Sequence, residues 1–236
     1  SEPYYVPFKG DANYRGYPSV LRDELFRQVE ALYERRIPVA IHCNGDASID
    51  DGLDAIEAAM AAHPWPEARP LIIHAQMTRM DQIDRMAQLG VTPSFFSAHT
   101  YYWGDRHAAI FMGPERAANM SPARWALDAG VRFSSHLDTP VTPMLPLQAV
   151  WSQVERESKG GVLIGPAQRI GRMPALRAVT IDAAWQVFME DEIGSIEPGK
   201  RADLVVLSEN PLTAEDIRGI KVDRTVIDGA TVYARL

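Results

Sequence analysis

The chain has 236 residues, 46% of them hydrophobic, so it can bury a large core in one domain or in two unequal ones. Its net charge of −7 and the lack of a basic run argue against nucleic acid or an anionic membrane as the main partner. The single cysteine, Cys43, excludes an intrachain disulfide framework and is typical of a reducing compartment. No apolar stretch approaches the roughly 18 residues that span a bilayer, and the N-terminus lacks a signal-peptide pattern. We therefore expect a cytoplasmic protein that acts on a small molecule.

The first half of the chain alternates helical and strand patterns. Apolar residues recur at helical spacing over 19–36, and Pro38 precedes a short buried strand over 39–42. A second helix is predicted over 48–62 with Ser48 as its N-cap, followed by a strand over 71–74. A third helix over 80–89 is closed by Gly90.

The alternation continues to about residue 157. A strand is predicted over 91–96, then a long loop over 97–106, a helix opened by Ser121-Pro122, a strand over 131–135 and a helix over 146–157. Repeated strand–helix units favour a parallel sheet, and therefore an α/β fold.

The pattern changes after Gly160. A helical stretch over 174–188 is followed by a strand over 202–208 and by two β-rich segments joined at Asp228-Gly229, a strong hairpin signal. We predict a small separate antiparallel sheet, and we divide the chain into a first domain over 1–190 and a second over 191–236.

Three residues that can bind a metal recur at one period. His42 and His74 are 32 residues apart, Asp138 follows His74 at twice that interval, and each lies at or just after the end of a predicted strand. About thirty residues is the length of one strand–helix unit, and α/β barrels carry their chemistry at the carboxyl ends of the strands. Imidazole and carboxylate groups suit zinc and related divalent ions. The spacing therefore predicts a metal site built from His42, His74 and Asp138.

Each of these residues also has a structural interpretation. A lone histidine at a strand end often packs without a metal, and Asp138 before Thr-Pro is typical of a turn. A metal-free α/β protein, in which the period reflects only fold geometry, is therefore the competing hypothesis.

Further polar residues lie close to these strand ends. His136 shares a strand face with Asp138 if the strand continues, or else begins a turn, and we leave it out of the ligand set. Asp46 either orients a ligand imidazole as a carboxylate behind the metal or caps the following helix. Cys43 should point away from the site, into the layer between sheet and helix.

The predicted loop over 97–106 is a candidate substrate-binding segment. Loops at the carboxyl edge of a parallel sheet often contact substrates, which favours His99, Tyr102 and Trp103 as substrate-binding residues. The alternative is a loop packed by its own aromatic side chains. His107, further along, is expected at the surface.

Several segments resemble one family. HCNGDASIDDGLDAIE, IIHAQ, SSHLDTPVTPMLPL and EIGSIEPGKRADLVVLSENPL are similar to successive motifs of the amidohydrolase superfamily, in its family-3 branch with N-substituted formamide deformylase. The resemblance extends over essentially the whole chain. It implies the C-terminal half of a TIM-type (α/β)8 barrel, followed by the last strands of a small β-sandwich.

The resemblance also implies roles for the strand-end residues. His42 and His74 would bind a divalent metal, with Zn²⁺ the first candidate and one or two ions in the intact enzyme. Asp138 would be a metal ligand and the general base of a hydrolase that cleaves a non-peptide C–N bond in an amide-like substrate. The division of Asp138 between these two roles stays open.

Part of the family pattern is missing. The family opens its barrel with a histidine–x–histidine pair on the first strand, and no such pair occurs in this chain. We therefore expect a truncated C-terminal part of a longer enzyme, with weak metal binding and little turnover. The alternative is a non-catalytic half-barrel that forms a homo-oligomer or pairs with its missing half.

Overall fold

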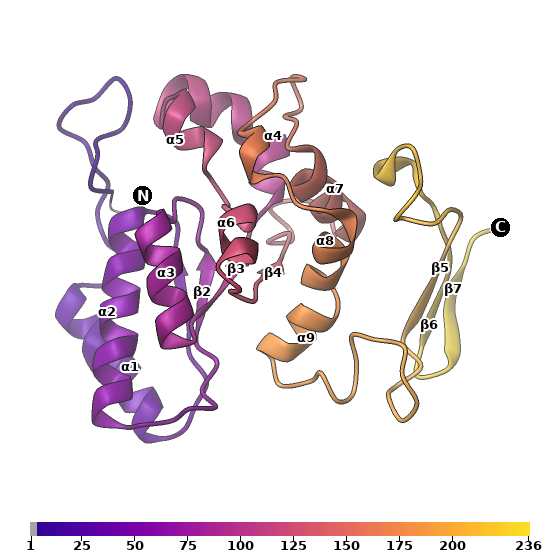
Figure 1. Cartoon of the computed structure of the whole chain (residues 1–236), viewed down its shortest axis with the longest axis horizontal. Coiled ribbons are helices and arrows are strands. Elements are labelled where there is room, and N and C mark those ends of the chain that lie inside the picture. The colour runs from indigo at the N-terminus through magenta and orange to yellow at the C-terminus, as the bar shows by residue number, and fades with distance from the viewer. Residues whose placement is uncertain (1–3) are drawn as a thin grey trace.

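A four-stranded parallel sheet forms the centre of the computed structural model, which describes residues 4–236 (Figure 1). The strands follow the chain order: β1 (Ala40–Cys43), β2 (Leu71–His74), β3 (Thr92–Phe95) and β4 (Ser134–Ser135). In the register, Cys43, His74, Phe95 and Ser135 form one row across the carboxyl ends of the strands. The α/β class and the parallel sheet predicted from the alternation are confirmed.

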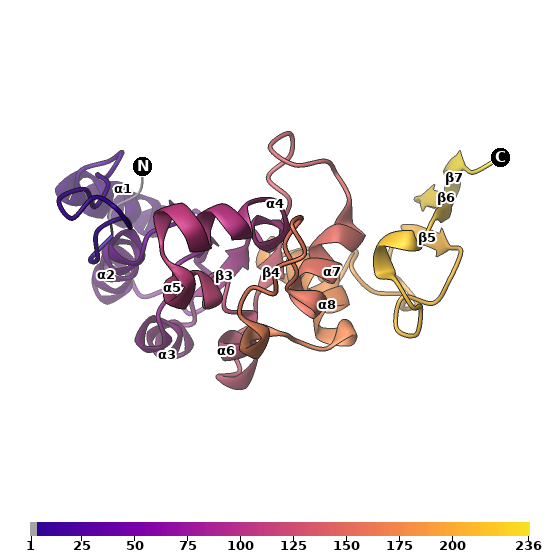
Figure 2. The same ribbon diagram turned by 90° about the horizontal axis from the view of Figure 1, so that it is seen from above.

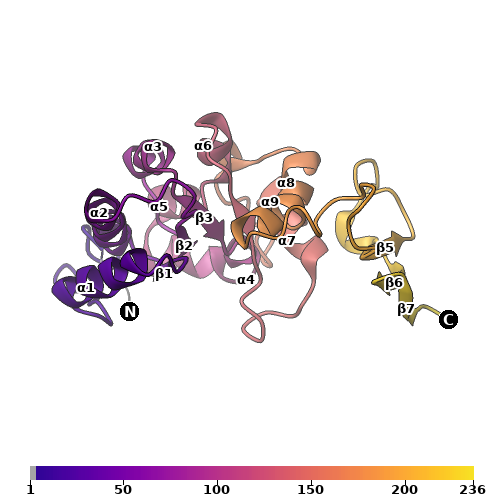
Figure 3. The ribbon, with the colours of Figure 1, turned by 90° about the horizontal axis from the view of Figure 1, so that it is seen from below.

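Helices connect the strands and pack around the sheet. These are α1 (Arg22–Glu34), α2 (Asp46–Ala62), α3 (Met80–Leu89), α6 (Ala123–Asp128), α7 (Pro146–Glu155), α8 (Arg172–Ala178) and α9 (Ile181–Gln186). Seen from above and from below, α2, α3, α6 and α8 follow one another along one side of the strands (Figures 2 and 3). A parallel sheet needs such cover because its strands are apolar on both faces.

The core fills the layer between the sheet and these helices. Its largest fully buried members include Tyr33, Leu53, Ile56, Ile72 and Phe95. Cys43 is buried in the same layer, where a Cβ added at Gly52 of α2 would lie 3.3 Å from its Sγ. The predicted direction of the Cys43 side chain is therefore confirmed.

The C-terminal segment forms a second, antiparallel sheet in the order β5 (Leu204–Leu207), β6 (Val222–Ile227) and β7 (Ala230–Ala234). Asp228 and Gly229 both have positive φ, as a two-residue hairpin turn requires, so the predicted hairpin is confirmed. The 3-10 turn η3 (Ile217–Gly219) packs against α7, and Ile217 is part of the main core. Figure 1 shows the second sheet at the side of the molecule beyond α7.

The prediction of a loop over 97–106 is wrong. This segment is helix α4 (Ala98–Arg106), continued by a π-helical turn, η1 (His107–Phe111), and the short helix α5 (Pro114–Ala118). Packing explains the helix, because Tyr101 meets Trp151 edge to face and Gly104 lets the helix approach Ile164 closely. A 3-10 turn, η2 (Pro166–Gln168), follows α7.

Three smaller predictions also need correction. Ser48 does not cap α2, which begins at Asp46, and its hydroxyl instead donates to the Gly45 carbonyl at 2.7 Å. The helix predicted over 174–188 is divided into α8 and α9 at Thr180, whose backbone leaves helical geometry. The strand predicted over 131–135 pairs only at Ser134 and Ser135. No helix in the described part of the chain is long and apolar enough to cross a membrane.

Candidate metal and substrate site

Two histidines meet at the carboxyl ends of neighbouring strands. The rings of His42 in β1 and His74 in β2 lie 4.4 Å apart between centroids, nearly at right angles. His74 has φ +67° and Ala75 φ +46°, so the backbone leaves the strand in the left-handed region immediately at this ring. Non-glycine residues held in this region are uncommon and cluster at functional sites. The structure thus brings together two of the three predicted ligands.

A third histidine, His136, completes a chain of polar contacts with this pair. His136 Nε2 lies 3.1 Å from His74 Nδ1, and His136 Nδ1 lies 3.0 Å from the hydroxyl of Ser94. Ser134 donates to the Ser94 hydroxyl at 2.7 Å, which extends these contacts to β4. Burial, and then the neighbouring His74, lower the pKa of His136 to about 4, so the ring is neutral near pH 7. His136 therefore fixes the orientation of His74.

Asp138 lies beyond this chain of contacts. Its side chain is exposed, its φ is +52°, and its carbonyl accepts from the amide of Val141 at 2.7 Å. Asp138 therefore lies in a turn, which was the structural interpretation of this residue. It lies near the histidine cluster, where its negative charge opposes the fall in the pKa of His136. A cavity of about 310 Å³ contains both residues in its lining.

The three predicted ligands do not form a closed set in this structure. Across residues 4–236, no three His, Cys, Asp or Glu side chains are placed to hold one ion. The histidine pair fits a divalent metal by donor type and proximity, whereas Asp138 shares a cavity lining with His136. The ligand set stays a prediction.

His99 is half-buried in α4 and stacks against the same cluster. Its ring centroid is 6.2 Å from that of His74 and 4.1 Å from that of Phe96. Burial, and then the neighbouring His107, His74 and His136, hold the pKa of His99 well below its ordinary value of 6.5. A neutral imidazole beside the strand ends suits contact with an uncharged substrate.

Tyr102 and Trp103 belong to the same helix as His99. Trp103 meets the His99 ring edge to face at 5.3 Å, and both aromatic residues pack against an apolar cluster that includes Phe96 and Leu137. These contacts agree with the alternative to substrate binding, in which the segment is packed by its own aromatic side chains. Their contact with substrate stays a prediction.

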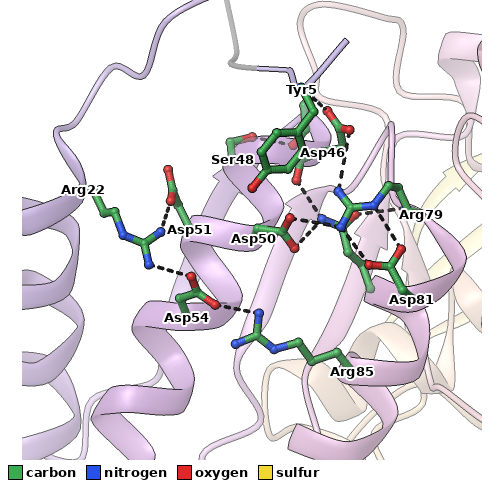
Figure 4. Close-up of polar contacts among 12 residues, drawn as sticks. Tyr5, Arg22, Asp46, Ser48, Asp50, Asp51, Asp54, Arg79, Asp81 and Arg85 are labelled. Atoms are coloured by element: carbon green, nitrogen blue, oxygen red, sulfur yellow. Dashed lines mark hydrogen bonds and ion pairs between the residues drawn. The ribbon is translucent and has the colours of Figure 1, made fainter.

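Asp46 begins α2 and belongs to a surface network of charges (Figure 4). Its carboxylate accepts from the amide of Tyr5 at 3.2 Å and lies 3.6 Å from Arg79 Nη1. Arg79 also binds Asp50 at 3.0 Å and Asp81 at 2.8 Å, which links α2 to α3. The identified contacts of Asp46 are with this network, and its predicted role behind a ligand imidazole stays a prediction.

A second set of ion pairs joins α1 to α2 and α3. Arg22 binds Asp51 and Asp54 of α2, and Arg85 of α3 binds Asp54 at 2.6 Å (Figure 4). Exposed ion pairs contribute little singly, but this connected set fixes three helices around β1 and β2. It thereby positions the strands that carry His42 and His74.

Comparison with known proteins decides the family. A sequence profile described as "Amidohydrolase family" matches residues 1–233, nearly the whole chain. The chain belongs to the amidohydrolase family.

Members of this family similar to the chain include a named enzyme and a solved structure. It is 34% identical over 201 residues to N-substituted formamide deformylase of Arthrobacter pascens, covering 84% of this chain and 37% of the relative. It is 26% identical to the putative amidohydrolase YtcJ of Bacillus subtilis strain 168, covering 97% of this chain and 44% of that protein. The crystal structure of an uncharacterized metal-dependent hydrolase from Pyrococcus horikoshii OT3 aligns with a TM-score of 0.78 and 26% identity, covering 90% of this chain and 42% of that one. The chain therefore spans less than half the length of these relatives.

Some residues of the candidate site were missed or misplaced from the sequence. His136 was left out of the set although it touches His74, and His107, expected at the surface, is half-buried with its ring against Phe111 and toward His99. Asn44 and Gln76 each follow a predicted ligand by two residues and line the adjacent cavity. That spacing beyond a strand end was the available signal for both.

Proposed function

We propose that this chain supplies the metal-binding histidines and the base of a hydrolase that cleaves a non-peptide C–N bond in a small amide, such as an N-substituted formamide. The observation that carries the proposal is the His42–His74 pair at adjacent strand ends, 4.4 Å apart. Family membership and the named relative support the hydrolase class. The chain spans less than half the length of these relatives, which is consistent with our expectation of a truncated part of a longer enzyme. We propose that the longer enzyme contains the complete barrel.

His42 and His74 would hold a divalent ion, with zinc the first candidate by ligand type. A bound ion of this kind polarises a substrate carbonyl and lowers the pKa of water to about 7. The contact of His136 Nε2 with His74 Nδ1 at 3.1 Å would hold the His74 ring in its orientation.

Asp138 would act as the general base. As an exposed carboxylate at the edge of the histidine cluster, it can take a proton from the attacking water and pass it to the leaving nitrogen. The nitrogen then leaves as a neutral amine rather than as an unstable anion. His99, Tyr102 and Trp103 would contact the remainder of the substrate.

Formate release from N-benzylformamide tests this function. We expect the zinc-loaded chain to release formate slowly, and Asp138→Asn to lower the rate by at least about a hundredfold, the usual scale for a general base. Asparagine tolerates the positive φ at this position, so the turn is preserved. Asp128→Asn, at the exposed end of α6, is the matched control. Formate release that is the same in Asp138→Asn or without metal would contradict the proposal.

The open edges of the sheet favour a second candidate function, a half-barrel module that self-associates. β1 and β4 are the outer strands of the four, and Ala40 and His42 of β1 are exposed. Unpaired strand edges are templates for pairing with another chain. Sedimentation velocity should then show concentration-dependent dimers that Ala40→Lys weakens, whereas a monomer at all concentrations would contradict this candidate.

A further inference from the structure

A groove of about 380 Å³ lies outside the histidine cluster. It is bounded by the N-terminal segment at Tyr4, the connection from β2 to α3, and the helices α5 and α6. Among the described residues, no histidine lines it, and it shares only Tyr4 with the cavity that Asn44 and Gln76 line. Its volume is in the range of small-molecule sites, so we consider it a site of its own.

Apolar side chains make up much of the wall of this groove. Tyr4 and Met77 are buried and Trp125 is half-buried, whereas Val6 and Met80 are 53% and 45% exposed. Exposed apolar side chains that gather beside a groove are typical of a binding site. The lining therefore favours a ligand with an apolar body, and Trp125 offers it an aromatic ring.

Two carboxylates in the lining are accessible to such a ligand. Glu115, in the first turn of α5, is exposed, and the side chain of Asp46 at the start of α2 is 15% exposed. Asp46 accepts one bond from the amide of Tyr5, and its other oxygen lies 3.6 Å from Arg79. Carboxylate oxygens have room for further donors, so both groups can receive an ammonium group.

The two arginines of the lining are already engaged. Arg79 lies among three carboxylates, those of Asp46, Asp50 and Asp81 (Figure 4). Arg116 donates from all three of its guanidinium nitrogens to backbone carbonyls, those of Met112, Val6 and Pro7. Neither guanidinium is therefore free to bind an anionic ligand.

Negative charge is in excess at this end of α2 and α3. Counted with the carboxylates that bind Arg79, four carboxylates stand against two guanidinium groups: Asp46, Asp50, Asp81 and Glu115 against Arg79 and Arg116. The Tyr5 ring packs on Arg79 at 5.4 Å, and burial, and then the charge of Asp50, nevertheless raise the pKa of its phenol. An ammonium ion would be attracted here, and an anion repelled.

We propose that this groove binds an organic ammonium ion with an apolar body, such as an arylalkyl amine, with its charge between Asp46 and Glu115 and its apolar part against Trp125 and Met80. A cation beside an aromatic ring gains further attraction from that ring. Hydrolysis of an N-substituted amide releases an amine of this class. The site is nevertheless argued from its own lining, and it stands apart from the proposed hydrolase function.

Calorimetric titration of the metal-free chain with 2-phenylethylammonium at pH 7 tests the proposal. The comparison probes are 2-phenylethanol, which lacks the charge, 3-phenylpropionate, which reverses it, and ethylammonium, which lacks the ring. We expect saturable binding of 2-phenylethylammonium with a Kd below about 1 mM. Each comparison probe should bind at least about fivefold more weakly, because it loses either the charge interaction or the apolar contact.

The tryptophan side chains report where the amine binds. The chain has five tryptophans, whose indole N–H signals can be followed by NMR after ¹⁵N labelling. We expect 2-phenylethylammonium to shift the signal of Trp125 and to leave that of Trp103, which packs on His99, in place. The variants Trp125→Phe and Trp103→Phe assign the two signals.

Glu115→Gln removes one carboxylate of the groove without changing its shape. It should weaken 2-phenylethylammonium by about three- to fivefold, the upper range for an exposed ion pair. The matched control, Glu67→Gln, lies in the exposed turn before β2 and should bind as the natural chain does. The double variant His42→Ala, His74→Ala should also keep the affinity, which separates this site from the proposed metal site.

Five outcomes would overturn the proposal: no saturable binding, equal affinity for 2-phenylethanol or 3-phenylpropionate, a shift of Trp103 in place of Trp125, equal affinity in Glu115→Gln and Glu67→Gln, or loss of binding in the double histidine variant. The last would place the amine at the histidine cluster. Failure of formate release or of zinc binding with intact amine binding would refute the proposed function alone.

Discussion

Replacing His107 by glutamine should make folding less sensitive to acid. Burial, and then the neighbouring Arg106, lower the pKa of His107 to about 4 from its ordinary value of 6.5. The folded state therefore holds the ring neutral while the unfolded chain takes up a proton below pH 6.5. Stability from this group is complete above pH 6.5 and is lost as the pH falls toward 4.

The linkage relation gives the magnitude. With pKa values of 6.5 unfolded and about 4 folded, His107 alone accounts for a loss of about 2 kcal/mol between pH 7 and pH 5. Glutamine does not titrate, and its side-chain oxygen can accept the bond that Gln76 donates to His107 at 3.1 Å. The variant should therefore lose about 2 kcal/mol less than the natural chain over this interval.

Urea unfolding of the metal-free chain at pH 7, 6 and 5 measures the effect. The natural chain, His107→Gln and a control, His63→Gln, are compared by the change in the free energy of unfolding with pH. His63 lies 3.7 Å from Glu30 at the end of α2, outside the histidine cluster, so its removal should leave the His107 contribution in place. Parallel pH profiles for the natural chain and His107→Gln would refute the reasoning.

Two further predictions concern positions that hold the fold around the site. Gly165→Ala should destabilise the chain by more than about 4 kcal/mol, because the added Cβ would lie 1.7 Å from the carbonyl oxygen of Ala118. The matched control, Gly161→Ala, should cost about 1 kcal/mol, because Gly161 also has positive φ but lies in open space. Equal midpoints in urea for these two variants would contradict that contact. Arg156→Met should cost about 3–5 kcal/mol by thermal unfolding, because the buried guanidinium donates to the carbonyls of Ala118, Met120, Ser121 and Ile164. Arg169→Met, which loses only exposed bonds to Glu155, should cost under about 1 kcal/mol, and a similar cost for both arginines would be the contrary result.

The order of strands and helices was predictable from the sequence because local patterns determine it. The apolar runs before His42 and His74 and the glycine after α3 mark elements whose neighbours along the chain are also neighbours in space. Helix α4 was missed because its burial depends on Trp151 and Ile164, more than 45 residues away, which no local pattern reveals.

The candidate site was predictable only as far as strand alternation holds. The strand–helix period correctly placed His42 and His74 at the ends of adjacent strands. It failed beyond β4, because the strand stops at Ser135 and the chain turns at Asp138, so His136 rather than Asp138 contacts His74. The cavity with Asn44 and His107 joins residues from β1 and from beyond α4, and only the folded chain brings them together.

Zinc affinity of the chain with and without the histidine pair tests the central claim most directly. Competition with a chromophoric chelator should show that the natural chain binds Zn²⁺ at least about tenfold more tightly than the double variant His42→Ala, His74→Ala. His63→Ala should bind as the natural chain does. Equal zinc affinity in the double variant and the natural chain would contradict the assignment of these strand-end histidines to a metal site.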